Sequence, residues 1–209
     1  MEKNYYTVKS ETENLTVIER SKFICRIRNV KDEEDAKAFI DSVKKEHSLA
    51  THNCYAYIAD EKGLVQKFSD DGEPQGTAGV PMLEVLKNRK MYKTAVVVTR
   101  YFGGVKLGAG GLVRAYSGAV CDCLDRAEVV DMQPVVYIEV FADYDKYSSI
   151  IRLEDENCSI IDNQFSDSIV SVFAIKEDFA KNFQDKLADI FSGNSNYNVK
   201  GKGFHAFKK

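Results

Sequence analysis

The six residues from Thr94 to Thr99 (TAVVVT) carry no charge and are mostly β-branched. Such a run is typical of a β-strand buried on both faces, because a strand with one face in water alternates apolar and polar residues. Other elements must then cover both faces of its sheet. The run therefore predicts a central strand, and the rest of the fold has to be built around it.

Glycine-rich loops flank this strand, and charge is distributed unevenly around it. From Val85 to Cys121 the sequence contains no Asp or Glu, although the whole chain has a net charge of -3. The basic residues of this segment are Lys87, Arg89, Lys90, Lys93, Arg100, Lys106 and Arg114. Segregated charge can steer a ligand even when the net charge is small. The segment therefore predicts a surface that meets an anion.

The second glycine-rich loop is the best candidate for the anion site. Its glycines permit positive φ and close backbone approach, and the helix expected to open at Gly108–Gly111 would present free N–H groups. The residues predicted to bind the anion are Arg100, Lys106, Arg114, Gly103, Gly104 and Gly108. The spacing is neither that of a P-loop nor G-x-G-x-x-G. A purely structural role, as a tight turn packed against a helix, is the alternative.

Six further polar or aromatic residues are predicted to line the same cleft. They are His52, Asn53, Asp70, Asp71, Glu73 and Tyr101. The acidic ones could hold Mg²⁺ or exchange protons, but Asp also favours turns and caps, and turn formation is the favoured interpretation. His52 and Cys54 share one face of a strand, so an imidazole–thiol pair is geometrically possible. No acid that would orient such a pair is identifiable, and Cys54 is expected in the core.

Composition limits the class of protein. Five cysteines, an odd number on mainly apolar segments, favour reduced thiols in the cytosol over a disulfide framework. No stretch approaches the roughly 20 apolar residues of a membrane span, and the polar N-terminus lacks the apolar core of a signal peptide. We therefore expect a cytoplasmic protein that binds no membrane, with no metal site, no cofactor and no identifiable catalytic residue.

Hydrophobic periodicity predicts strands and helices in both halves of the chain, an α+β fold. The elements expected in the first half are a hairpin of residues 5–9 and 14–19, strands at 21–28, 52–59, 64–68 and 94–99, and helices at 32–46, 81–90 and from 108 onward. Gln133-Pro134 interrupts the pattern and is the predicted boundary between domains 1–133 and 134–209. The second domain is predicted as strand–helix–strand–strand–helix–strand, with elements at 135–141, 144–154, 158–165, 169–175, 179–191 and 196–207.

Four motifs in the first domain closely resemble the IMPACT family, in its bacterial YigZ/YvyE-type branch. The motifs are Ser21-Lys22-Phe23, His52-Asn53-Cys54-x-Ala56-Tyr57, Ser69-Asp70-Asp71-Gly72-Glu73-Pro74-x-Gly76-Thr77-Ala78-Gly79 and Arg100-Tyr101-Phe102-Gly103-Gly104-x-Lys106-Leu107-Gly108. The departures are Tyr55 where Trp is expected, Val80 where a basic residue is common, and Ala109 where Thr is common. None of these changes falls on a residue that defines a motif.

The resemblance implies a ribosomal protein S5 domain 2-like fold for residues 1–133. For residues 134–209 it implies a ferredoxin-like fold similar to domain V of elongation factor G, whose domain IV is itself S5-like. A translation-associated regulatory role follows, in which the N-terminal domain binds RNA, the ribosome or a phosphate-bearing ligand through its basic glycine-rich cleft. The alternatives are an enzyme acting on a phosphorylated or nucleotide-like small molecule, and a protein-interaction module.

Overall fold

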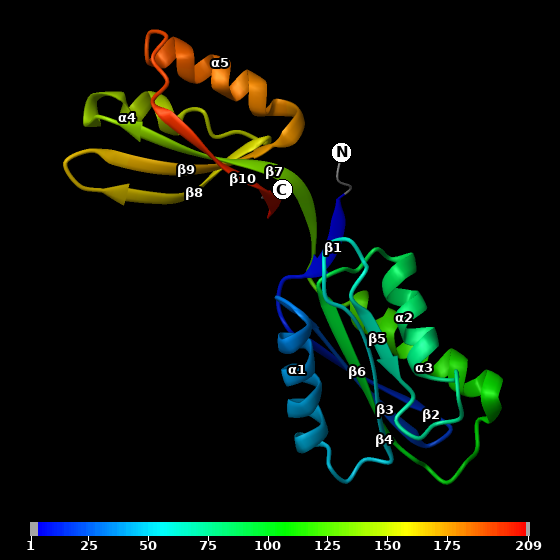
Figure 1. The fold of residues 1–209 in the computed structure, drawn as a ribbon. Coiled ribbons are helices and arrows are strands. Elements are labelled where there is room, and N and C mark those ends of the chain that lie inside the picture. Colours follow the sequence, from blue (N-terminus) through cyan, green and yellow to red (C-terminus); the bar gives the residue numbers. More distant parts are fainter. Residues whose placement is uncertain (1–3, 208–209) are drawn as a thin grey trace. The chain divides into compact units, whose positions relative to one another are not determined.

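The computed structural model describes residues 4–207, which form two compact units (Figure 1). Tyr5–Val130 make up the N-terminal unit, and the chain from Asp131 onward, with Asn4, makes up the C-terminal unit. The division falls shortly before the boundary predicted between residues 133 and 134. Both units contain helices and strands, so the chain is of the α+β class.

The N-terminal unit is built on a five-stranded antiparallel sheet with the strand order β2-β3-β6-β4-β5. The strands are β2 (Thr12–Ile18), β3 (Ser21–Asn29), β6 (Thr94–Tyr101), β4 (His52–Ile58) and β5 (Gln66–Ser69). β6 occupies the middle of the sheet, and every residue in it except Tyr101 is buried. The prediction of a central strand at residues 94–99 is therefore confirmed.

Helices cover both faces of this sheet (Figure 1). α1 (Glu33–Glu46) packs on one face, and α2 (Gly79–Asn88) and α3 (Gly108–Leu124) pack on the other. Alternate residues of β6 pack into the two hydrophobic cores, one on each face of the sheet. Val96 and Val98 pack with α2 and α3, whereas Ala95 and Val97 pack with α1. This division explains why the strand is apolar at consecutive positions.

The helix boundaries follow from local capping. α1 begins where expected, because the Asp32 carboxylate accepts the N–H of Asp35 at 2.8 Å and acidic residues fill the first turn. α2 begins at Gly79, before the predicted start at Pro81. The helix starts earlier because the carboxylate of Asp70, eight residues before Ala78, accepts the N–H groups of Ala78 and Gly79. These hydrogen bonds satisfy backbone donors that would otherwise be unpaired at the helix start.

The predicted hairpin of residues 5–9 and 14–19 is wrong. β1 (Tyr5–Val8) pairs with β7, and β2 pairs with β3. The hairpin turn between β2 and β3 is Glu19-Arg20, with both residues at positive φ (46° and 66°), as a type I′ two-residue loop requires. Glu-Arg is not one of the dipeptides that usually signal such a turn, so the pairing was not visible in the sequence.

The C-terminal unit has the predicted order strand–helix–strand–strand–helix–strand. Its elements are β7 (Val129–Ala142), α4 (Tyr144–Ile151), β8 (Cys158–Phe165), β9 (Ile169–Lys176), the short 3-10 helix η1 (Glu177–Phe179), α5 (Ala180–Ile190) and β10 (Tyr197–Ala206). These four strands lie side by side in the order β10-β7-β9-β8. Phe183 and Leu187 of α5 pack on Ile138, Phe173 and Ile175 of the sheet.

Gln133-Pro134 does not interrupt the chain, contrary to the prediction. Both residues lie inside β7, where Pro134 is opposite Phe204 of β10. Proline has no N–H to donate, so within a sheet it is best tolerated where that N–H would have no partner strand. The pairing of β7 with β9 begins at Val135, one residue later. At Pro134 the missing donor therefore costs no hydrogen bond to β9.

Candidate functional site

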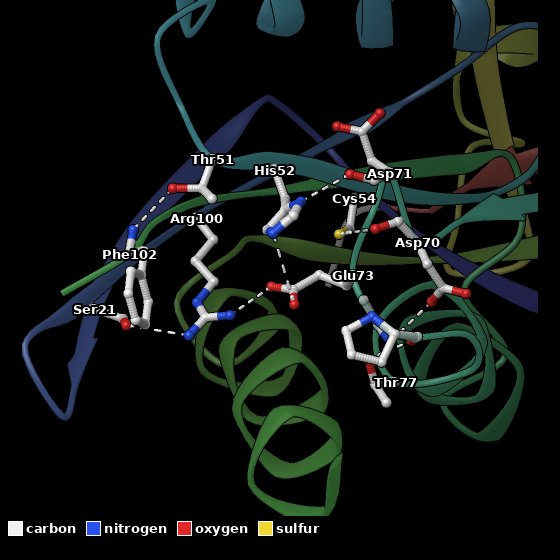
Figure 2. Close-up of polar contacts among 12 residues, drawn as sticks. Ser21, Thr51, His52, Cys54, Asp70, Asp71, Glu73, Thr77, Arg100 and Phe102 are labelled. Carbon is white, nitrogen blue, oxygen red and sulfur yellow. Dashed lines mark hydrogen bonds and ion pairs between the residues drawn. The ribbon is translucent and has the colours of Figure 1, made fainter. Parts of the chain in front are cut away.

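Arg100, predicted to contact an external anion, is buried and faces Glu73 (Figure 2). The side chains of Arg100 and Glu73 are only 6% and 3% exposed. Nη1 of Arg100 donates to Oε1 of Glu73 at 2.7 Å, and Nη2 donates to Oγ of Ser21 at 3.3 Å. The guanidinium also lies over the rings of Phe23 and Phe102. The charge of Arg100 is therefore used inside the protein and is not presented at its surface.

Glu73 is the centre of a buried carboxylate cluster formed with His52, Arg100 and Tyr116. The Tyr116 hydroxyl donates to Oε1 of Glu73 at 2.8 Å, and Nε2 of His52 lies 3.8 Å from Oε2. Nδ1 of His52 donates to the carbonyl of Asp71 at 2.9 Å, which directs Nε2 toward Glu73 (Figure 2). Burial raises the pKa of Tyr116, and the neighbouring Cys54 and Glu73 raise it further. The hydroxyl therefore remains a donor.

Asp70 forms a turn and caps a helix, in agreement with the favoured interpretation of the acidic loop. Its carboxylate accepts three backbone N–H groups, from Gly76 at 2.9 Å, Ala78 at 3.0 Å and Gly79 at 2.8 Å. These donors hold the loop from Ser69 to Gly79 against the start of α2. The acceptor capacity of Asp70 is therefore used by the backbone.

Asp71 is likewise held by groups of the protein. Oδ2 accepts the N–H of Asn53 at 2.7 Å, and Oδ1 pairs with Nζ of Lys44 at 2.8 Å. Burial acts to raise the pKa of Asp71, but the hydrogen bonds from Lys44 and Asn53 outweigh it and hold the pKa below its ordinary value. The charged carboxylate thus ties the acidic loop to β4 and α1.

The six residues predicted to line one cleft are divided between the two faces of the sheet. His52 is opposite Arg100 in the β4–β6 register, and Asn53 is opposite Thr99. Because consecutive strand residues point to opposite faces, Asn53 and Tyr101 lie on the α1 side, away from His52 and Glu73. There Asn53 accepts a hydrogen bond from Thr99 at 2.8 Å. Adjacency in the sequence did not mean adjacency in space.

The glycines of the second loop have two different roles. A Cβ on Gly103 would lie 2.0 Å from the carbonyl carbon of Arg20, so Gly103 packs against the β2–β3 turn. Its N–H donates to Ser21 Oγ at 3.2 Å. Gly104 and Gly108 have positive φ, and a Cβ on either would meet no atom within 4 Å. Gly103 therefore has the purely structural role that was the alternative to anion binding. At Gly104 and Gly108 the backbone remains accessible to a ligand.

Three cations lie on the segments that adjoin this loop, and we call them the basic rim: Arg20 in the β2–β3 turn that contacts Gly103, Lys106 in the loop itself, and Arg114 in α3. All three are exposed, and none has a hydrogen-bond or ion-pair partner among residues 4–207. α3 carries Arg114 and starts two residues after Lys106, without a side-chain cap and without an acidic residue in its first turn. Arg20 was missed by the sequence reasoning because the β2–β3 turn that carries it was not predicted.

Comparison with known proteins identifies the family. Residues 19–124 match the family described as the Impact N-terminal domain. The chain belongs to the IMPACT family. It is 42% identical to IMPACT family member YvyE of Bacillus subtilis (strain 168), with 92% of this chain and 89% of that protein covered. IMPACT family member YigZ of Escherichia coli (strain K12) is 36% identical over 84% of this chain and 88% of that one.

A crystal structure of a hypothetical protein resembles the chain as a whole. It aligns with 31% identity and a TM-score of 0.62 over 100% of this chain and 99% of that one. The matched family segment contains the basic rim and the buried carboxylate cluster. The IMPACT-family part of the chain thus coincides with the part that carries the candidate site.

All five cysteines are free thiols. Within residues 4–207 no group of three or more His, Cys, Asp and Glu side chains is arranged to hold a metal ion. In the same range no helix is long and apolar enough to cross a membrane.

His52 and Cys54 do lie on one face of β4, but the thiol of Cys54 is not paired with the imidazole of His52. Cys54 is buried and its Sγ donates to the carbonyl of Asp70 at 2.9 Å. Burial raises the pKa of the Cys54 thiol to about 12. We expect iodoacetamide to leave Cys54 unmodified in the native protein at pH 8 and to modify it after denaturation in urea, as measured by peptide mass spectrometry. Rapid native alkylation of Cys54 would instead support an imidazole–thiol pair.

Proposed function

We propose that this IMPACT-family chain is a translation-associated regulatory protein of the cytoplasm that binds RNA through its basic rim. The observation that carries the proposal is the set of three exposed cations without partners among the described residues, beside the uncapped start of α3. A helix N-terminus presents free N–H groups and the positive end of the helix dipole, both of which favour phosphate. Lys and Arg side chains supply the charge that dominates affinity for nucleic acids.

An exposed aromatic ring favours RNA over a free phosphate. Phe102 immediately precedes the glycine loop and is 47% exposed. Its N–H donates to Thr51 Oγ1 at 3.0 Å, and the Arg100 guanidinium lies 5.5 Å from the ring centroid (Figure 2). A ring held in this way can stack on an unpaired base, which is how proteins commonly bind single strands. The basic rim and Phe102 together fit a single-stranded phosphate backbone with accessible bases.

Arg100 has a positioning role in this proposal. It donates to Ser21 Oγ, the atom that also accepts the Gly103 N–H, and so it links the carboxylate cluster to the loop. It also lies behind the ring of Phe102. In this proposal Lys106 and Arg114 contact the phosphate. Arg100, predicted from the sequence to do so, supports the loop instead.

The proposal of a translation role also rests on fold likeness. A five-stranded antiparallel sheet with helices on both faces is compatible with an S5 domain 2-like N-terminal unit. The order β10-β7-β9-β8 in a strand–helix–strand–strand–helix–strand unit is that of a split βαβ, ferredoxin-like domain. The same pair of domain types occurs in elongation factor G. Likeness of fold is an analogy, and the function has to be tested at the site.

The test is binding of a fluorescently labelled single-stranded RNA, measured by anisotropy at several salt concentrations. For single strands the slope of log K against log salt is about 0.7 per phosphate contact. We expect the double variant Lys106→Ala, Arg114→Ala to bind more weakly and to lose roughly twice that slope. Both residues are exposed and without partners in the described chain, so the fold should tolerate their replacement.

Lys45→Ala supplies the matched control. Lys45 is also exposed, but it lies on α1, which packs on the sheet face opposite to α3. Unchanged RNA affinity in the double variant, or affinity that does not depend on salt, would contradict the proposal. A double variant that keeps RNA affinity but loses binding of inorganic phosphate would point to a phosphate-bearing small ligand.

A further inference from the structure

A pocket lies on the α1 face of the N-terminal sheet. It has a volume of about 270 Å³ and is bounded by α1, β4 and β5. Its lining residues are Lys37, Ile40, Asp41, Lys44, Tyr55, Tyr57 and Lys67. Tyr55 and Tyr57 are opposite Val97 and Ala95 of β6, which belong to the core beneath α1. The pocket is therefore on the other face of the sheet from Glu73 and Arg100.

The spacing of the residues explains why they converge. Positions 37, 40, 41 and 44 recur at three- and four-residue intervals and so share one side of α1. Tyr55 and Tyr57 are two residues apart on β4 and point to the same face. Lys67 is directly opposite Tyr57 in the β4–β5 register and extends from the neighbouring strand. The pocket thus has lysines from both a helix and a strand around two tyrosine rings.

Ammonium groups dominate the lining of this pocket. Lys67 is exposed and has no hydrogen-bond or ion-pair partner among the described residues. Lys37 pairs with Glu33 at 2.9 Å and Lys44 pairs with Asp71 at 2.8 Å, but neither of those acids lines the pocket. Asp41 is the single acidic residue of the lining. An anion that entered would meet three ammonium groups. Lys67 is the one of the three without a hydrogen-bond or ion-pair partner among the described residues, and its interaction with the Glu33 carboxylate is electrostatic only.

The tyrosines give the pocket an aromatic wall. Their rings are nearly parallel, at 6° with centroids 6.4 Å apart, and Nζ of Lys44 lies 5.4 Å from the centroid of Tyr55. Tyr57 is buried and donates its hydroxyl to Glu33 at 2.7 Å. Tyr55 is half-buried, and its hydroxyl has no partner in residues 4–207. Tyr55 is therefore the ring that a ligand can reach, with a free hydroxyl beside it.

We propose that this pocket binds a small anion that carries a flat ring, of the class of the nucleoside monophosphates. Lysine ammonium groups bind phosphate as point charges, and Lys67 and Lys44 would hold it from two sides. The ring would pack on Tyr55, since offset aromatic pairs are favourable. The volume is slightly below the 300–1,000 Å³ usual for ligand pockets, so it fits one mononucleotide and not a longer chain. The site is independent of RNA binding at the basic rim.

The experiment is calorimetric titration of the full chain with uridine monophosphate, uridine and inorganic phosphate. We expect uridine monophosphate to bind more tightly than either of the other two, because only it uses both the lysines and the ring. Lys67→Gln should weaken its binding about tenfold, the effect of losing one charged hydrogen bond. Lys45→Gln on the same helix lies outside the pocket lining and should have no effect.

Two outcomes would overturn the proposal. The first is that uridine monophosphate binds no more tightly than inorganic phosphate, or does not bind at all at millimolar concentration. The other is binding that Lys67→Gln leaves unchanged. The variant Lys106→Ala, Arg114→Ala separates the two sites, since it should weaken RNA binding at the basic rim and leave binding of the mononucleotide unchanged. Mononucleotide binding that disappears in that double variant would place the ligand at the rim and reject the pocket.

Discussion

Removing either partner of the Arg100–Glu73 pair is expected to lower the free energy of unfolding by about 3–5 kcal/mol. Arg100→Ala would leave the Glu73 carboxylate, whose side chain is 3% exposed, without its cation. Glu73→Ala would leave the buried guanidinium of Arg100 without its carboxylate, and it would also remove the acceptor of the Tyr116 hydroxyl. An unpaired buried charge costs far more than the loss of an exposed ion pair.

Urea denaturation followed by circular dichroism measures this effect, and Arg89→Ala is the matched control. Arg89 pairs with Asp125, but those side chains are 39% and 61% exposed, so the loss should be at most about 1 kcal/mol. The double variant Glu73→Leu, Arg100→Met removes both charges and keeps apolar volume. It should recover much of the stability. A small effect of Arg100→Ala would mean that Arg100 is available to bind an external anion, as the sequence suggested.

Gly103→Ala is expected to destabilise the N-terminal unit by at least about 1–3 kcal/mol. The added Cβ would lie 2.0 Å from the carbonyl carbon and 2.2 Å from the carbonyl oxygen of Arg20, and 2.4 Å from the nitrogen of Ser21. All three are backbone atoms in a tight turn, so no side chain can move aside. The glycine loop would have to separate from the β2–β3 turn, which would also displace Phe102.

Gly118→Ala is the control for this substitution. Gly118 lies within α3, and a Cβ there would meet no atom within 4 Å. Replacing a glycine inside a helix by alanine should stabilise by about 0.5–1 kcal/mol. The two alanines should therefore shift the urea midpoint in opposite directions. Stability of Gly103→Ala equal to that of the unsubstituted protein would contradict the close approach of the loop to the turn.

Much of the fold could be predicted from local pattern. The apolar run at residues 94–99 indicated the central strand, and the six elements predicted for the second domain occur in the predicted order, the first of them beginning at Val129. Hydrophobic periodicity is a local property of the chain, because it records which side of an element is buried. The four motifs also indicated the IMPACT family, which residues 19–124 confirm. The expected break at Pro134 was wrong, because Pro134 lies inside β7 and is opposite Phe204 of β10, which is distant in the sequence.

The sequence indicated which residue types surround the candidate site more accurately than it indicated the role of each residue. Lys106, Arg114, Gly104 and Gly108 are exposed in the loop before α3 or in its first two turns. Arg100 follows the same basic pattern, yet it is turned into the protein by a carboxylate 27 positions earlier. Nothing in the spacing of charges distinguishes a cation that pairs with a distant internal acid from one that remains free.

By itself the sequence determined the type and order of most elements, the family, and the acid-free character of the segment around β6. The tertiary structure alone decided which cations remain free, which residues share a face, and that β1 pairs with β7. It also assembled the lysine and tyrosine pocket from three separate elements. The physical reason is that burial and pairing of charge depend on contacts between distant residues. Hydrophobic periodicity indicates which side of a helix or strand is buried, and only the packed chain shows which residues cover that side.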